Sequence, residues 1–213
     1  MPRINAATVA EHRARQRRAV LDAARDLLAE TGQAPSLADV GARAGLARSS
    51  VYEYARSRDD LLAAVVADVL PSWAQRIQDA MAQAPTPGAR VWAYVEANVA
   101  FFAGDEQRVA RALGSVVDPA VLSGPMQEFH AALQEPLRAA LREHGEPEPD
   151  AVADVVDAMI LSATKSARAR QRPSDPAERT AILDPLRRLL GPYLGLARDR
   201  SGCSSPAAEG STQ

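Results

Sequence analysis

Two short helical patterns follow each other in residues 36–62, SLADVGARAGLARSSVYEYARSRDDLL. Ser36 can cap the first helix through its hydroxyl. The apolar residues of that helix fall on one face at helical spacing, at Leu37, Val40 and Ala44. Gly45 stands where a left-handed residue would end the helix, and a second short helix over about residues 47–54 can then start at a steep angle. Two helices that cross in this way form a helix-turn-helix.

The second helix has polar groups for its outer surface, while Val51 points inward. Hydroxyl, phenol and guanidinium groups of this kind bond to phosphates and to the edges of bases. The residues predicted to contact DNA from this helix are Arg48, Ser49, Ser50, Tyr52 and Tyr54.

An amphipathic helix precedes this pair and would cover it, with apolar residues at Val20, Leu21, Ala24, Leu27 and Leu28. Before that helix comes a basic run, Arg13, Arg15, Arg17 and Arg18. Residues 1–58 contain ten Arg against six Asp and Glu, a charge of about +4, so the net charge of -2 leaves about -6 for the remainder. We therefore expect the basic end to be the end that meets DNA. Charge alone is also compatible with chance variation among solvated faces.

Over residues 13–65 the chain resembles the TetR-type transcriptional regulators. The resemblance rests on the capped helix, the Ala-Gly-apolar turn at residues 44–46, the exposed polar helix, and Tyr52 and Tyr54, followed by a basic residue, Arg58, shortly before two leucines. It adds Ser36 and Arg58 to the expected DNA-binding residues. It also implies an all-α fold, with an N-terminal three-helix DNA-binding domain followed by a ligand-binding and dimerisation domain of about six helices.

The chain departs from the family pattern at three positions. Ala55 stands where a phenylalanine usually packs beneath the recognition helix, and losing a buried Phe side chain costs about 3 to 5 kcal/mol if nothing fills the space. Ala47 stands where a serine commonly caps the recognition helix, a contribution of about 1 kcal/mol. Arg58 replaces a lysine and keeps the phosphate contact. The first two changes predict a DNA-binding module that is less stable than usual, or one whose core is packed by other side chains.

The rest of the chain shows helical apolar stripes and no convincing strand pattern. Pro71 should bend or break the helix that follows the DNA-binding module. The fifth helix is expected to end near Gly104, and the sixth at residues 118–119. The seventh helix is expected to begin at Ser123 and to have a kink at Pro136. The predicted segments are a flexible arm at 1–12, the DNA-binding domain at 13–60, the effector and dimerisation domain at 61–198, and a disordered tail at 199–213.

The resemblance implies a homodimer that forms through the last two helices, at about 150–171 and 175–190. Their wide apolar stripes agree with this, although the same stripes could simply be core. A small effector that binds between the helices would shift the fourth helix and change the distance between the two DNA-binding domains of the dimer. Pro71 is either a hinge in that helix or a plain boundary between two helical pieces.

The effector pocket can only be nominated from helices that line the cavity in the family. The candidates are Trp92, Asn98, Phe101, Phe102, Met126, Phe129, His130 and Met159. For any one of them an ordinary core or surface role is the alternative, and a polar amide such as that of Asn98 beside an apolar stripe is costly unless it is hydrogen-bonded. Few positive charges fall on these faces, which favours a mostly apolar effector.

Other classes of protein have weaker support. The three histidines, His12, His130 and His144, lie on separate segments, and no nucleophile, phosphate-binding or zinc motif is present, so we expect no catalytic residue, metal site or cofactor. Cys203 is the single cysteine, and no apolar run approaches 18 residues, which predicts a soluble cytoplasmic protein without membrane contact. The remaining alternative is a degenerate relative that dimerises and binds ligand or protein but does not read DNA.

Overall fold

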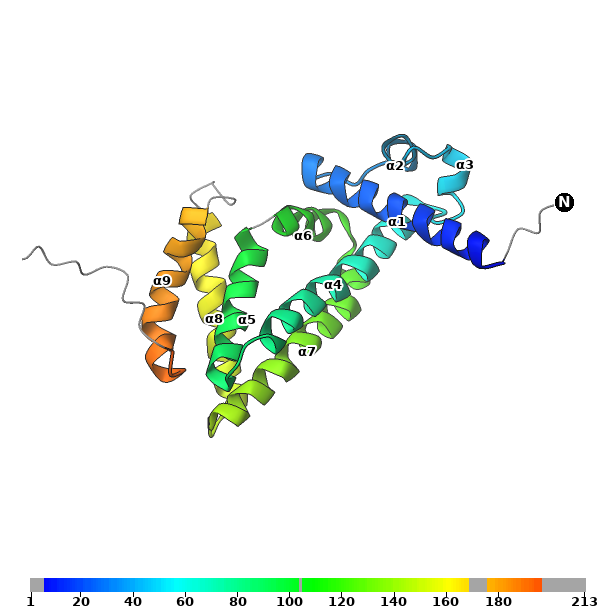
Figure 1. Ribbon diagram of the computed structural model, residues 1–213. Helices are drawn as coiled ribbons and strands as arrows, with labels where there is room; N and C mark the ends of the chain where they lie inside the picture. Colours follow the sequence, from blue (N-terminus) through cyan, green and yellow to red (C-terminus); the bar gives the residue numbers. More distant parts are fainter. Residues whose placement is uncertain (1–5, 104, 169–175, 197–213) are drawn as a thin grey trace, which may run out of the picture.

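The computed structural model describes residues 6–103, 105–168 and 176–196, and within these ranges all regular structure is helical (Figure 1). The prediction of an all-α fold is confirmed. The helices are α1 (Ala6–Thr31), α2 (Leu37–Ala44), α3 (Arg48–Val51), α4 (Arg58–Ala82), α5 (Pro87–Ala103), α6 (Asp105–Val116), α7 (Pro119–His144), α8 (Pro149–Arg168) and α9 (Pro176–Tyr193).

Two hydrophobic cores follow each other along α4. The first core joins α1, α2, α3 and the first half of α4, and it also takes in α6 through Val109, Ala112 and Leu113. The second joins the later part of α4 to α5, α7, α8 and α9. With 25 residues, α4 is about 37 Å long and belongs to both cores. We call the part around the first core, without α6, the head, and α5 to α9 the body.

Five prolines lie inside the described helices without ending them. α4 continues through Pro71, α7 continues through Pro125 and Pro136, and α9 continues through Pro185 and Pro192. The break expected as one outcome at Pro71 is therefore not present, and a bend at that position stays a prediction. The ring of Pro71 is exposed, while Leu70 and Trp73 beside it are buried, so the packed face of α4 is held on both sides of the missing backbone donor.

α7 begins at Pro119 rather than at Ser123, because Asp118 caps it: its Oδ1 accepts from the amide of Ala120 at 2.8 Å. The last two helices lie close to the predicted ranges, and α9 runs three residues further, to Tyr193.

The predicted terminal segments lie only partly within the described ranges. Of the arm expected at 1–12, the residues from Ala6 onward are the first turns of α1. The tail expected at 199–213 lies outside the described residues. The boundary expected at residue 60 falls inside α4, which starts in the head and continues into the body. In the described ranges, no helix has the length and apolarity needed to cross a membrane.

Candidate nucleic-acid interface

The turn between α2 and α3 has the geometry that the sequence predicts. Ser36 caps α2: its Oγ accepts from the amide of Asp39 at 3.1 Å and donates to Asp39 Oδ2 at 2.6 Å. Gly45 ends the helix at a φ of 68°, a left-handed conformation that glycine adopts without strain. The amide of Leu46 then donates to the carbonyl of Gly41 at 2.9 Å, which closes the turn.

A second glycine lets α2 and α3 approach closely. A Cβ added to Gly41 would lie 3.1 Å from the carbonyl oxygen of Leu46 and 3.2 Å from Cγ2 of Val51. Val51 is fully buried and anchors α3 in the first core. The crossing of the two helices therefore depends on a small residue in α2 and one buried valine in α3.

The outer surface of α3 and of the turn after it is polar. Arg48, Ser49 and Tyr52 are exposed, and Ser50 is half-buried. The guanidinium of Arg48 donates from Nη2 to the hydroxyl of Tyr52 at 3.0 Å. The exposed surface of α3 and its turn thus carries a cation, a phenol and a hydroxyl, a combination suited to phosphate oxygens and base edges.

The other three predicted DNA contacts have structural partners within the protein. Tyr54 is half-buried, and its hydroxyl donates to Oε1 of Gln16 at 3.0 Å. Arg58 donates from Nη2 to the carbonyl of Ala34 at 2.7 Å, and Ser36 is engaged in its cap. For all seven residues a role in DNA contact stays a prediction. The spacing of three residues from Val51 to Tyr54 was the sequence signal that Tyr54 shares the inward face.

The two unusual alanines of the module have different consequences. Ala55 is buried in the first core, and the half-buried ring of Tyr54 packs against the same core. Ala47 occupies the N-cap position of α3 with φ -62° and ψ 146° and makes no side-chain cap hydrogen bond. α3 has only four residues, so an uncapped amide group at its start is a substantial defect.

We expect Ala47→Ser to raise the free energy of unfolding by about 1 kcal/mol. The backbone at this position already has the extended conformation of an N-cap, so the new hydroxyl can accept from an amide of the first turn. Urea unfolding at equilibrium measures the change, with Ala42→Ser on the exposed side of α2 as the control. A stability equal to that of the wild type would show that the start of α3 is satisfied in another way.

A cavity of about 220 Å³ lies in the body, next to α4, α5 and α6. Its lining residues are Trp73, Arg76, Ile77, Ala97, Ala100, Phe101 and Glu106. The rings of Trp73 and Phe101 meet edge to face, with centroids 4.5 Å apart. Nη1 of Arg76 lies 2.7 Å from Oε1 of Glu106. The lining is apolar apart from this single ion pair.

A larger cleft of about 540 Å³ lies beside α1, α4 and α6 and shares the Arg76–Glu106 pair with the cavity. Its lining is mostly charged. Arg18 bonds to Asp22 and Asp68, and these carboxylates raise the pKa of its guanidinium. The cleft is therefore lined by an ion-pair network, whereas the smaller cavity offers the apolar surface that the expected effector needs.

Phe101 is the one nominated effector residue that lines this cavity. Trp92 is buried, with the guanidinium carbon of Arg187 at 5.3 Å from its ring centroid, and Asn98 is buried and donates from Nδ2 to the carbonyl of Tyr94 at 2.9 Å. The others pack half-buried in the cores (Met126, Phe129, Met159), lie exposed (His130), or have a side chain outside the description (Phe102).

The remaining cavity residues were not nominated from the sequence. Trp73 and Ile77 lie on the apolar stripe of α4, which carries no mark of a cavity. Ala97 and Ala100 leave room because they are small, and alanines are frequent throughout this chain. The Arg76–Glu106 pair joins residues 30 positions apart, and nothing local in the sequence predicts it.

A partly buried carboxylate joins three helices of the body. Asp157 of α8 accepts from the hydroxyl of Tyr94 of α5 at 2.6 Å and from the side-chain amide of Gln134 of α7. Burial raises the pKa of Asp157, although the two donors oppose that rise. Burial and the neighbouring carboxylate also raise the pKa of Tyr94.

We expect Asp157→Asn to be neutral or stabilising at pH 7. The folded-state pKa of Asp157 lies above its unfolded value of about 3.9, so this group contributes less stability as the pH rises through that interval. In the variant the Gln134 amide can turn, so that its Oε1, which has no partner among the described residues, accepts from the new asparagine. Thermal unfolding at pH 4 and pH 7 measures the effect, and a large loss of stability for the variant at pH 7 would contradict it.

The head and its turn define the class of this protein: a helix-turn-helix joined to a helical body. Residues 20–65 match the family model described as bacterial regulatory proteins, tetR family. The resemblance to this family is therefore confirmed over most of the head, and the described chain has the fold of tetR-family regulators. No curated protein sequence matches the chain.

Solved structures extend the likeness to the body. The transcriptional regulator FadR from Bacillus subtilis, in complex with stearoyl-CoA, has a TM-score of 0.64 and 14% identity, covering 81% of this chain and 96% of its own. The tetR-family regulator PfmR from Thermus thermophilus has a TM-score of 0.59 and 21% identity, with 80% and 96% covered. SmeT in complex with triclosan has a TM-score of 0.58 and 21% identity, with 82% and 90% covered. At these identities the likeness shows the fold.

Proposed function

We propose that this protein is a ligand-responsive transcriptional repressor that binds a palindromic operator as a homodimer and leaves it when a small, mostly apolar effector binds. The observation that carries the proposal is the surface of α3. A capped α2, a left-handed turn at Gly45 and a buried Val51 hold Arg48, Ser49 and Tyr52 outward, where a duplex can reach them.

Exposed apolar residues on the last two helices support the homodimer. Val155 on α8 is 55% exposed and Leu189 on α9 is 68% exposed, and Leu161 adds to the exposed apolar surface of α8. Leaving large aliphatic side chains in water on two neighbouring helices is unfavourable, whereas a second copy of the same face would cover them. In such a dimer two recognition helices about one turn of DNA apart can read a palindrome.

The cavity beside Trp73 and Phe101 supports a mostly apolar effector. Apart from the Arg76–Glu106 pair its lining is aromatic or aliphatic. The related structures named above include complexes with stearoyl-CoA and with triclosan, two compounds with large apolar parts. An apolar site with a few polar groups is what such ligands bind.

α4 supports the coupling between effector and DNA. Its first half, with Val65, packs in the core of the head, and its second half, with Ile77, packs in the body and lines the cavity. An effector that fits only one position of α4 shifts the population of that position, and a coupling of about 1 to 3 kcal/mol suffices. Pro71 lies between the two halves and is the proposed hinge, so an intact effector response in Pro71→Ala would remove that role.

Binding to DNA from the region upstream of its own coding sequence tests the proposal. We expect a labelled duplex from that region to bind at least about 10³-fold more tightly than a random duplex, and binding to weaken with salt. Arg48→Ala should lower the specific affinity about 10- to 100-fold, as expected for one lost base or phosphate contact. Arg142→Ala, at the far end of α7, is the control and should bind as the wild type does (Figure 1).

The uncapped, four-residue α3 favours one alternative, a degenerate relative that no longer binds DNA specifically. The same binding experiment distinguishes this alternative from the proposed regulator. If the wild-type protein does not bind the labelled upstream duplex even at low salt, the result contradicts the proposed regulator and supports the alternative.

A further inference from the structure

α1 extends well beyond the head. Figure 1 shows its first half leaving the head on the side where α3 lies. Of residues 9–19 no side chain is buried, and the first buried one is Val20. Residues 9–18 therefore form a helical segment of about 15 Å that adds almost nothing to the hydrophobic core.

The projecting segment is strongly basic. Residues 6–18 contain four arginines against one acidic residue, Glu11. Arg13, Arg15 and Arg17 are exposed, and none of them forms an ion pair with a described residue.

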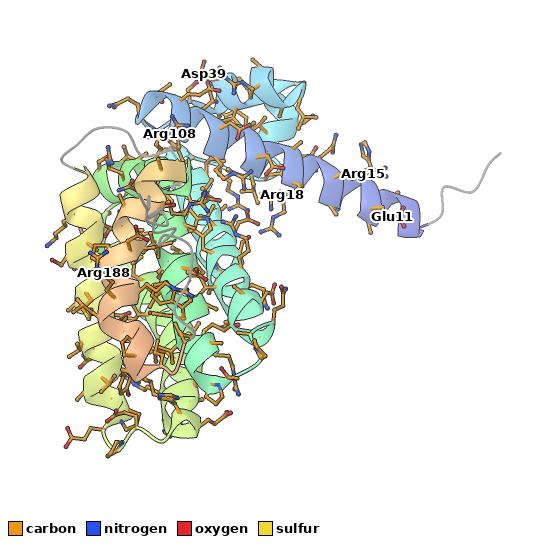
Figure 2. The ribbon with its side chains drawn as sticks, turned by 60° about the vertical axis from the view of Figure 1, so that its left-hand side comes forward. Glu11, Arg15, Arg18, Asp39, Arg108 and Arg188 are labelled. Carbon is orange, nitrogen blue, oxygen red and sulfur yellow. The ribbon has the colours of Figure 1, made fainter. Side chains whose placement is uncertain are left out.

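Arg18 differs from the other three arginines. It bonds to Asp22 within α1 and to Asp68 of α4 at 2.8 Å, so its charge is already neutralised inside the protein. Figure 2 shows Arg15 on the projecting half of α1 and Arg18 closer to the other helices. The arginines without an ion-pair partner among the described residues thus lie on the part of α1 that packs outside the hydrophobic core.

The segment is fixed next to the recognition helix. Gln16 of α1 accepts from the hydroxyl of Tyr54, three residues after the end of α3. Arg13 lies one helical turn before Gln16 on the same side of α1, and Arg17 follows Arg13 by four residues. Arg17 also lines one surface hollow together with Glu53 and Tyr54. When α3 lies in a major groove, this stripe is held beside it.

We propose that α1 binds the phosphate backbone next to the groove that α3 occupies, through Arg13 and Arg17, which lie on the same side of the helix as Gln16. This inference rests on the proposed function and adds a contact surface to it. Phosphates are the anions that a helix beside the recognition helix would meet first, and exposed guanidinium groups bind them with good geometry. Phosphate contacts of this kind add affinity and fix the orientation of the head without reading sequence.

The test compares the full-length wild type with a double variant, Arg13→Ala and Arg17→Ala, and with a second double variant that has lysine at both positions. The affinity for the upstream duplex and for a random duplex is measured over a range of KCl concentrations. The slope of log affinity against log salt is expected to fall by roughly 0.9 for each phosphate contact removed, hence by about 2 or more if each protomer of a dimer loses one contact.

Three further readouts make the result decisive. The alanine variant should lose the same factor in affinity on both duplexes, because phosphates carry no sequence information. The lysine variant should keep the slope, because it keeps the charge. The helix content by circular dichroism should be that of the wild type in both variants.

A wild-type slope in the alanine variant, or a lysine variant as weak as the alanine variant, would overturn the inference while leaving the proposed function standing. If the wild type itself fails to bind either duplex, the proposed function fails, and this inference fails with it.

Discussion

Gly88→Ala is expected to lower the free energy of unfolding by about 3 kcal/mol or more, the largest loss of stability we expect from a single methyl group in this protein. A Cβ at this position would lie 2.0 Å from the carbonyl oxygen of Leu194 and 3.0 Å from its carbonyl carbon. Gly88 is in the first turn of α5, and Leu194 follows the last turn of α9. The obstacle is backbone, so no rotation of a side chain can relieve it.

The structure can respond in only one direction. α5 is held in the second core by fully buried residues such as Val91 and Val95, whereas the end of α9 follows a helix with one exposed face. We therefore expect the end of α9 to move away from α5, which would expose Leu190 and Leu194. Urea unfolding measures the loss, and hydrogen exchange of α9 locates it.

Gly114→Ala is the matched control. Gly114 lies inside α6, is exposed, and has no heavy atom within 4 Å of an added Cβ. Because alanine favours the helix more than glycine does, this variant should gain about 0.5 to 1 kcal/mol. Equal stabilities for the two variants would mean that α5 and α9 do not meet as closely as described.

The helix-turn-helix of the head could be predicted from the sequence because its signals are local. A serine cap, an apolar stripe and a left-handed glycine all fall within residues 36–45, and each has one physical meaning. The structure places the cap and the turn at the expected residues. The exposed residues of α3 could also be predicted, because the single buried residue Val51 determines which side of this four-residue helix faces the core.

Three parts of the site could not be predicted, since they depend on residues far apart in the chain. The hydroxyl of Tyr54 bonds to Gln16, 38 positions away, and although the spacing from Val51 indicates an inward side chain, it does not indicate this partner. Arg58 bonds to the carbonyl of Ala34, and the Arg76–Glu106 pair joins α4 to α6. A helical periodicity shows which face is apolar, but not which neighbour covers it.

Pro71 is another position where local sequence alone leaves the outcome open. It predicts a bend or a break in α4, because its ring removes a backbone donor and collides with the preceding turn, and the helix is not broken there. Buried residues on both sides, Val69 and Trp73 among them, hold the helix together across that position. Tertiary packing therefore outweighs a local cost of about 3 kcal/mol.

Leu189→Arg is expected to convert the proposed dimer into monomers. Leu189 is 68% exposed on α9, so an arginine there adds no strain to the protomer. In a two-fold interface the same residue occurs twice, and two unpaired guanidinium groups would be buried against an apolar face at a cost of several kcal/mol. Sedimentation velocity at micromolar concentration should therefore show a monomer with wild-type helix content.

The loss of the dimer should also remove operator binding. A single head keeps the contacts of one half-site only, so the affinity for the palindrome should fall by 100-fold or more. Val121→Arg is the control: Val121 is 44% exposed on α7, outside the proposed interface, and the variant should stay dimeric and bind normally. A dimeric Leu189→Arg, or a monomeric Val121→Arg, would place the interface on a different face, and the separation of the two recognition helices would then have to be set by helices other than α8 and α9.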